Sequence, residues 1–154
     1  MPSEEMLMLK PGHLIRRAQQ IAVAVFMEEC GHFDVTPVQY AALAAIAQQP
    51  DIDATRLSLL IALDRSNTGS VLERLEAKSL VLRHTSPADR RVKLLRLSAA
   101  GQALLRQLDE AVERAQQRIV APLRPAERKL FIRLLAQLVE SNNALSRAPA
   151  GGIA

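Results

Sequence analysis

Five basic side chains gather in one short segment of the chain, between residues 79 and 97. A single acid, Asp89, accompanies them, so the segment carries a net charge of +4, which equals the net charge of all 154 residues. The remainder of the chain is neutral overall, and the segment forms one local cationic patch. A polyanion such as a nucleic acid is the natural partner of such a patch. The five basic residues are Arg83, Arg90, Arg91, Lys93 and Arg96.

Asp89 and Arg91 lie two positions apart within this segment. Side chains at i and i+2 of an extended strand lie on the same side, so we expect the Asp89 carboxylate to hold the Arg91 guanidinium in one orientation. Arg91 would enter a minor groove, most favourably a narrow A·T-rich one, while Arg90 and Lys93 contact phosphates. The alternative is a solvated charge run with a surface ion pair worth about 0–1 kcal/mol.

The residues around this triplet predict a β-hairpin. Residues 80–83 and 92–97 are rich in Leu and Val, which favours two short strands, and residues 85–88 suit the loop between them. Leu94 and Leu95 interrupt the alternation of the second strand, so its register stays open. A small, strongly cationic hairpin is predicted.

An amphipathic helix is predicted directly before the hairpin. Asp64 is a favourable N-cap, and 3.6-residue geometry places five residues on one face: Thr68, Val71, Leu72, Leu75 and Ser79. The opposite face carries Ser66, Ser70, Glu73 and Ala77, with Asn67, Gly69 and Arg74 beside it. A short polar face at a helix N-terminus suits the major groove of DNA. An ordinary solvated helix face is the alternative.

Three helices are predicted upstream. The first covers residues 11–31, and the second begins at Thr36, where Pro37 and Gln39 complete a capping box, and ends near Gln48. Asp53 can cap a short third helix that ends in a tight turn at residues 62–63. The third helix, the turn and the helix after Asp64 form a helix-turn-helix.

Two helices are predicted after the hairpin. Ser98 caps a long one, and Pro122 and Pro125 separate it from a last helix rich in Leu. Together with residues 11–31, these helices carry more apolar surface than one small domain can cover. We expect a homodimer that places two recognition helices roughly 34–36 Å apart. Packing within one chain is the alternative.

Composition limits the remaining possibilities. The length suits one domain, and the aromatic content of 3% disfavours base stacking on single strands. No segment approaches the roughly 20 apolar residues of a membrane span, and no signal peptide is recognised, so we expect a cytoplasmic protein without a membrane partner. The single cysteine, Cys30, fits a reducing compartment.

Several ordered motifs resemble the MarR family of bacterial transcriptional regulators. They are Leu63-Asp64-Arg65-Ser66, Leu72-Glu73-Arg74-Leu75-Glu76, Asp89-Arg90-Arg91 and Leu97-Ser98-Ala99-Ala100-Gly101. The resemblance spans about residues 11–140. It implies a mainly α fold with a small β-hairpin, a winged helix-turn-helix with N- and C-terminal dimerisation helices. It also implies a homodimeric repressor that binds a pseudopalindromic operator and is released by a small ligand.

The resemblance implies a single MarR-type domain over residues 1–154. Residues 11–31 and 98–145 would be dimerisation helices, 36–97 the winged helix-turn-helix and 146–154 a flexible tail. The DNA-binding residues would be Arg65, Ser66, Asn67, Ser70, Arg74, Asp89, Arg90, Arg91 and Lys93. Three positions differ from many relatives: Ser70 stands where they have a base-contacting arginine, Gly69 interrupts the helix, and Ser79 replaces a capping glycine.

A ligand site is expected where the dimerisation helices meet the winged domain. Guanidinium groups bind carboxylates, and histidine or tyrosine can hydrogen-bond a ring substituent. The resemblance is greatest to the branch that senses aromatic or heteroaromatic carboxylates. The expected ligand-binding residues are His13, Arg16, Arg17, His32 and Tyr40. The alternative is that these residues belong to ordinary solvated helix faces.

Three other functions fit the residues less well. Cys30 could sense oxidants, but Glu28 and Glu29 would raise its pKa and no sequence neighbour would lower it, so we expect a buried, inert thiol. A catalytic set of Ser66, His84 and Asp89 lacks a nucleophile elbow, and the chain has no phosphate or dinucleotide motif, so we expect no enzyme, metal or cofactor. A protein-interaction module would not need the cationic hairpin.

Overall fold

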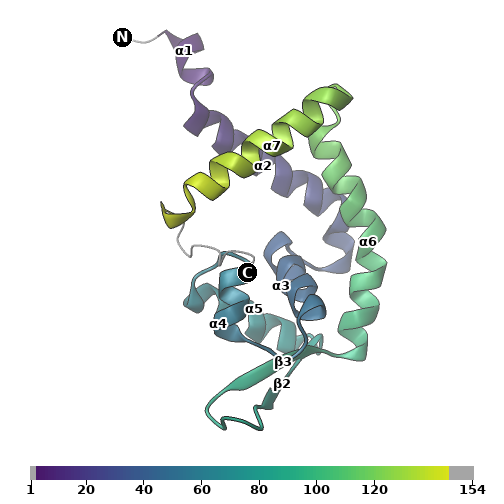
Figure 1. Cartoon of the computed structure of the whole chain (residues 1–154). Helices are drawn as coiled ribbons and strands as arrows, with labels where there is room; N and C mark the ends of the chain where they lie inside the picture. Colours follow the sequence, from purple (N-terminus) through teal and green to yellow (C-terminus); the bar gives the residue numbers. More distant parts are fainter. Residues whose placement is uncertain (1–2, 146–154) are drawn as a thin grey trace.

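Helix boundaries in the computed structural model, which describes residues 3–145, follow the capping residues of the sequence (Figure 1). Thr36 and Gln39 form the predicted capping box, with bonds of 3.2 and 3.3 Å. Asp53, Asp64 and Ser98 each accept a backbone N–H as N-caps. The helices are α1 (Glu4–Met8), α2 (Pro11–Cys30), α3 (Pro37–Gln48), α4 (Ala54–Leu60), α5 (Arg65–Ala77), α6 (Ala99–Val120) and α7 (Pro125–Ser141), with 3₁₀ turns η1 (Gly31–Phe33) and η2 (Asn143–Leu145).

The two ends of the chain differ in how they compare with the sequence predictions. The short helix α1, capped by Ser3, was not predicted, because five residues give too little periodicity to recognise. The predicted flexible tail, residues 146–154, lies outside the described residues.

The sheet has three antiparallel strands, in the order β1-β3-β2, where a two-stranded hairpin was predicted. The strands are β1 (Ile52–Asp53), β2 (Val81–Thr85) and β3 (Lys93–Leu97). The additional strand β1 joins through the pairs Ile52 with Leu95 and Asp53 with Leu94. A two-residue strand leaves no alternation in the sequence, so only its pairing with β3 reveals it.

The open register of β3 is now settled. Leu97 lies opposite Val81 and Leu95 opposite Arg83, so Leu95 and Leu97 point into the core. Leu94 therefore belongs to the outer face of the sheet. The inward leucines join the main core between α3, α4, α5 and the sheet, whose most buried members include Leu43, Ile46, Leu57, Leu72 and Leu75.

Serine occupies a left-handed position where α5 turns into β2. Ser79 has φ of 59° and follows the C-cap Lys78. Its N–H donates to the Glu76 carbonyl at 2.8 Å, and the Leu80 N–H donates to the Leu75 carbonyl at 3.0 Å. These are the two bonds of a Schellman motif, in which glycine is the favoured residue at this position. The departure from glycine noted in the sequence thus places a strained serine at the helix end.

A second core joins α2 to α6 and includes Phe26, Cys30, Val35, Leu108 and Val112. Most other apolar side chains of α2 are exposed, as are those of α7, which has no buried residue among its described positions. In Figure 1, these helices lie at the end of the molecule opposite to the hairpin. The exposed apolar residues there include Met6, Leu7, Met8, Leu14, Ile15, Ile21, Leu130, Phe131, Ile132, Leu134, Leu135, Leu138 and Val139.

Candidate nucleic-acid interface

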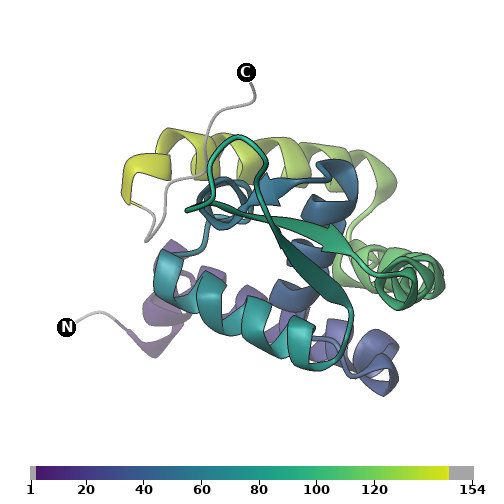
Figure 2. The same ribbon diagram turned by 90° about the horizontal axis from the view of Figure 1, so that it is seen from below.

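Helix α5 presents the polar face that its sequence predicted. Thr68, Leu72 and Leu75 are buried, whereas Ser66 and Ser70 are exposed on the other side. In the view of Figure 2, α5 and the β2–β3 hairpin lie together on the face turned to the reader. Helix α5 and the cationic hairpin are thus neighbours on one face of the molecule.

The N-terminal cap of α5 also holds a side chain that was predicted to contact bases. The Asp64 carboxylate accepts the Asn67 backbone N–H at 2.8 Å and the Asn67 side-chain amide at 2.7 Å. Ser70 donates its hydroxyl to the Ser66 carbonyl at 3.3 Å. Arg74 is exposed and forms no ion pair within residues 3–145, so its guanidinium is available to a ligand.

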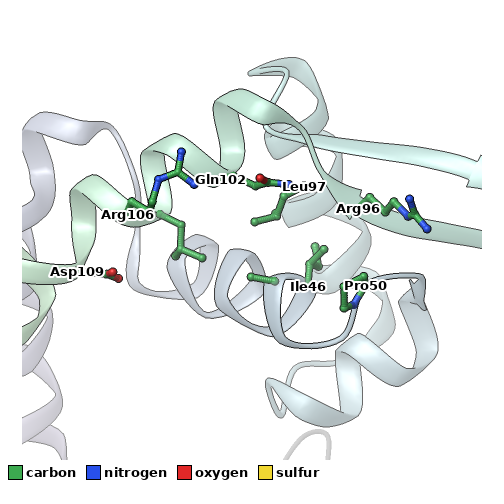
Figure 3. Close-up of a pocket in the computed structure, with 9 residues that line it drawn as sticks. Ile46, Pro50, Arg96, Leu97, Gln102, Arg106 and Asp109 are labelled. Carbon is green, nitrogen blue, oxygen red and sulfur yellow. The ribbon is translucent and has the colours of Figure 1, made fainter.

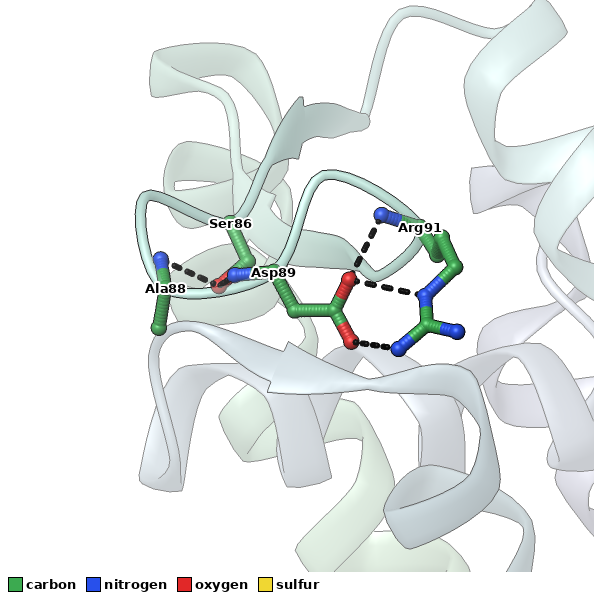
Figure 4. A network of polar contacts seen from close by, with 4 residues as sticks. All are labelled: Ser86, Ala88, Asp89 and Arg91. Atoms are coloured by element: carbon green, nitrogen blue, oxygen red, sulfur yellow. Dashed lines mark hydrogen bonds and ion pairs between the residues drawn. The ribbon is translucent and has the colours of Figure 1, made fainter.

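Asp89 and Arg91 pair at the tip of the hairpin, as predicted (Figure 4). The Arg91 guanidinium donates to both carboxylate oxygens, at 3.1 and 3.2 Å, and the Arg91 backbone N–H donates to the same carboxylate at 3.0 Å. The expected extended geometry was wrong, because Val92 N–H donates to the Asp89 carbonyl and closes a turn. A turn brings residues two apart together more tightly than strand alternation does.

This turn fixes the charge state of Asp89. The Arg91 guanidinium and then the Arg91 backbone N–H hold the pKa of Asp89 below its usual value. Ser86 adds a second constraint, because its hydroxyl accepts the Ala88 and Asp89 N–H groups at 3.2 and 3.4 Å. The Arg91 side chain itself is 89% exposed. Asp89 therefore orients the guanidinium, which a ligand can still approach.

Acidic residues from outside the hairpin neutralise part of its positive charge, so its net charge in the structure is lower than the sequence count of the segment. Arg83 pairs with Glu76 of α5, and Arg96 pairs with Asp51. Arg90 has no ion pair within the described chain, and Lys93 donates to the Thr85 hydroxyl at 2.7 Å. Counting charges in one segment missed the acids that the fold brings in from elsewhere. The uncompensated charge concentrates on Arg90 and Lys93.

A concave site of about 280 Å³ lies between the hairpin and the start of the helix-turn-helix. Arg65 lines it from the first residue of α5 and donates to the Thr55 hydroxyl of α4. Arg91 and Lys93 line it from the hairpin. Side chains predicted separately as DNA-binding residues therefore meet around one cationic hollow, a suitable place for a phosphate.

Asp51 links both strands of the hairpin to the turn before β1. Its carboxylate accepts two hydrogen bonds from Arg96, both 2.7 Å long, and lies 3.0 Å from His84 Nε2. His84 is thus oriented by Asp51 and not by Asp89, so the Ser66, His84 and Asp89 set is not assembled. The sequence offered no signal for the role of Asp51, which lies 45 positions from Arg96.

The expected ligand-binding residues fall into two groups within one chain. Arg16 lies 3.4 Å from His13 Nδ1, and Arg17 is exposed beside them in the first half of α2. His32 packs on Phe33 in η1 and Tyr40 on Phe26, beyond the other end of α2. A helix rises about 1.5 Å per residue, so Arg16 and His32 lie roughly 24 Å apart. The fold of one chain does not bring all five residues together.

A separate hollow of about 570 Å³ lies between α3, β3 and α6 (Figure 3). Arg106 and Gln102 reach over its edge from α6, while Ile46 and Leu97 supply apolar surface. None of the five expected ligand-binding residues lines this hollow. The side chains that line it come from elements too far apart in the sequence to have been grouped beforehand.

Cys30 is fully buried in the core between α2 and α6. Burial and then the charge of Glu29 raise the pKa of its thiol. No sequence neighbour lowers this pKa, as expected, but α6 brings the distant Arg114 close enough to oppose the rise. Glu28, which was also expected to raise this pKa, is not among its causes; its carboxylate pairs with Arg118 at 2.6 Å. The net effect is the inert thiol that was expected.

Within residues 3–145, no helix combines the length and apolar content that crossing a lipid bilayer requires.

Comparison with known proteins agrees with this geometry. The family model described as "MarR family" matches residues 35–93. A putative transcriptional regulatory protein for the hcr operon of Thauera aromatica is 35% identical over 133 residues, covering 86% of this chain and 80% of that protein.

Two solved structures are similar along nearly their whole length. Bordetella bronchiseptica BpsR, whose DNA binding is regulated by 6-hydroxynicotinic acid, has a TM-score of 0.84 and 31% identity, covering 91% of this chain and 99% of BpsR. The PcaV transcriptional regulator from Streptomyces coelicolor, in complex with its natural ligand, has a TM-score of 0.80 and 31% identity, covering 90% and 97%. These relatives are regulators and not enzymes. The chain belongs to the MarR family of transcriptional regulators.

Proposed function

We propose that the chain is a homodimeric repressor that binds a pseudopalindromic DNA operator and leaves it when a small aromatic or heteroaromatic carboxylate binds. One observation carries the proposal: α5 and the β2–β3 hairpin lie together on one face of the molecule (Figure 2), and the exposed Arg91 of the hairpin loop is oriented by Asp89. A helix and a wing placed in this way can contact a major groove and the neighbouring minor groove together. The whole chain would be one domain, with residues 36–97 as the winged helix-turn-helix.

Each DNA-binding residue has a proposed role. Ser66, Asn67, Ser70 and Arg74 contact the major groove, where Arg74 either contacts a base or anchors a phosphate. Arg91, oriented by Asp89, enters the minor groove. Phosphates are held by Arg65, Arg90 and Lys93, which are charged and near the same hollow or the hairpin tip.

Selection from a random duplex library with the purified chain tests this interface. The affinity for the selected duplex should fall steeply as salt rises, with a log–log slope near −0.9 per neutralised phosphate. Arg91→Ala should weaken binding by about 1–3 kcal/mol, mostly at A·T-rich flanks. Arg106→Ala on α6 serves as the control of equal charge loss. A flat salt response would contradict the proposal and favour a protein-interaction module.

Arg74→Ala separates base contact from phosphate anchoring. Loss of base contact should reduce the affinity for the selected duplex by about 1–3 kcal/mol and leave binding to a scrambled duplex nearly unchanged. Equal losses on both duplexes would show that Arg74 anchors a phosphate and does not select sequence.

The dimer is proposed from the exposed apolar side chains of α2 and α7. Residues 11–31 and 98–145 would form the dimerisation helices, although much of the apolar face of α6 packs against α2 of its own chain. Leu135 is 42% exposed on α7, a poor position for leucine in a monomer. Leu135→Glu should shift the sedimentation mass towards one chain, whereas Gln137→Glu, the same charge on the same helix, should not. A monomeric parent protein would refute the dimer.

The effector site is proposed to combine both groups of expected ligand residues across the dimer. Because roughly 24 Å separates the groups in one chain, Arg16 and its neighbours of one subunit would act with His32 and Tyr40 of the other. Titration with 6-hydroxynicotinic acid or benzoate should raise the melting temperature and weaken DNA binding. Arg16→Met should abolish both effects, with Lys129→Met as control. No response to either acid would remove the proposed effector class.

A further inference from the structure

Three residues link the two strands of the hairpin to the turn before β1, and we call them the Asp51 clasp: Asp51, His84 and Arg96. His84 belongs to β2 and Arg96 to β3, so one carboxylate holds both strands. Their bonds to Asp51 measure 3.0 Å from His84 and 2.7 Å from Arg96. The clasp lies along the paired strands of the hairpin, whose loop carries Arg91: Arg96 pairs with Leu82 nearer the base, and His84 pairs with Leu94 next to the last pair before the loop.

The backbone brings the Asp51 carboxylate to this place. Asp51 has φ of 67°, in the left-handed region, and its N–H donates to the Leu95 carbonyl at 3.0 Å. The next residue, Ile52, begins strand β1 opposite Leu95. Asp51 therefore stands beside Arg96 on the outer face of the sheet, the face that also carries His84.

We propose that Asp51 is a positioning residue for the DNA-binding wing, and that protonation of His84 tightens the clasp that Asp51 forms across both wing strands. A tighter clasp restricts the directions in which the hairpin loop can point, so less conformational freedom is lost when Arg91 binds DNA. This inference rests on the proposed DNA-binding role of the wing.

The charges around His84 favour this direction of response. Asp51 and Arg96 face His84; Arg96 holds the pKa of Asp51 below its usual value, so the carboxylate stays ionised at neutral pH. Asp53 of β1 stands in the same cross-strand row but accepts the Arg56 backbone N–H. Arg83 and Lys93 alternate to the other face, where Arg83 pairs with Glu76 of α5. Histidine is the side chain that commonly gains a charge between about pH 8 and 5.

Two substitutions isolate the clasp from the fold. Asp51→Asn removes the charge but keeps the shape, and asparagine tolerates the left-handed backbone as well as aspartate does. His84→Gln keeps a hydrogen-bond donor near the Nε2 position but cannot gain a charge in this range. Asp109→Asn, on the exposed surface of α6, is the control for loss of one carboxylate.

The test measures affinity of the full chain for the selected duplex at pH 8.0 and 6.0 and at constant ionic strength. The parent protein should bind about two- to five-fold more tightly at pH 6.0 than His84→Gln does, the range that one partly exposed ion pair supplies. At pH 8.0 the two should agree. Asp51→Asn should bind more weakly than the parent at both pH values, and adding His84→Gln to it should weaken binding no further. Two results would overturn the proposal: a His84→Gln variant whose affinity depends on pH as the parent's does, or an Asp51→Asn variant that binds as tightly as the parent.

A readout without DNA separates this proposal from the function on which it rests. In the ¹⁵N-labelled full chain, backbone amide signals of Ser86 and of residues 88–92 should shift between pH 8.0 and 6.0 in the parent and not in Asp51→Asn. A parent that binds no duplex but shows these shifts would refute the DNA-binding proposal and support the clasp. Wing signals that are the same in both proteins would refute the clasp.

Discussion

Two glycines in the same protein should respond to alanine in opposite directions. Gly101, in the first turn of α6, is buried against the residue that precedes β2. A Cβ built on it would lie 2.2 Å from the Leu80 carbonyl oxygen and 3.1 Å from its carbonyl carbon. Ordinary contact begins near 3.4 Å, and the obstacle is backbone, which cannot rotate away. Gly101→Ala therefore forces α6 away from the sheet.

The expected loss follows from three contributions. Overpacking of this kind costs about 1–3 kcal/mol. The displaced Leu80 carbonyl also accepts the Ser98 N–H at 3.0 Å, a bond worth about 0.5–1.5 kcal/mol. Alanine regains up to about 1 kcal/mol of helix propensity. We expect a net loss of roughly 1–3 kcal/mol.

Gly69 provides the matched control. It lies inside α5, and no heavy atom lies within 4 Å of a Cβ built there. Gly69→Ala should raise the free energy of unfolding by about 0.5–1 kcal/mol, because alanine restricts the unfolded chain more. If Gly69→Ala instead lowers the free energy of unfolding, a second molecule must approach α5 at Gly69, because no such contact exists within one chain.

Urea unfolding followed by circular dichroism measures both changes. All variants must be compared at one chain concentration, because assembly would add to the apparent stability. With a slope of about 2 kcal/mol per molar urea, the midpoint should fall by roughly 0.5–1.5 M for Gly101→Ala. A Gly101→Ala midpoint equal to the parent would refute the steric account of this junction.

Three further outcomes are expected. Ser79→Gly should stabilise the chain by about 0.5–1 kcal/mol in the same urea assay, because it relieves a left-handed serine; no gain would contradict strain at this cap. The Cys30 thiol should react with Ellman's reagent more than roughly tenfold slower in the native chain than in the unfolded one, because burial protects it and raises its pKa; equal rates would contradict its burial. Arg114 and Arg118 lower the pKa of Glu29, so this pairing stabilises the fold above about pH 4.5 and is lost as pH falls further. Acid titration of Glu29→Gln should therefore lose part of the drop in melting temperature that the parent shows, and an unchanged drop would remove Glu29 from the cause.

Most of the wing geometry could be predicted, but for a partly wrong reason. The Asp89–Arg91 pair was expected from strand alternation and is instead made by a turn that Val92 closes. Both geometries place residues two apart on one side, so the pair alone did not distinguish them. The partners of Arg83 and Arg96 could not be predicted, because opposite charges attract at any sequence separation once the fold brings them together.

The sequence by itself determined where four of the helices begin. Thr36, Asp53, Asp64 and Ser98 each cap a backbone N–H group only three residues away, so the bond forms wherever the local chain turns into a helix. The burial of Thr68 on the inner face of α5 likewise followed from 3.6-residue periodicity.

Tertiary structure alone decided which distant groups meet. The two-residue strand β1 exists because β3 pairs with it, and the Asp51 clasp exists because that pairing sets Asp51 beside Arg96. It also decided that Arg114 opposes the effect of Glu29 on Cys30 and that the expected ligand residues divide into two groups. Such contacts join residues far apart in the sequence, and closing the long loop between them costs conformational entropy. The contacts therefore form only when the core has already ordered the elements that carry them.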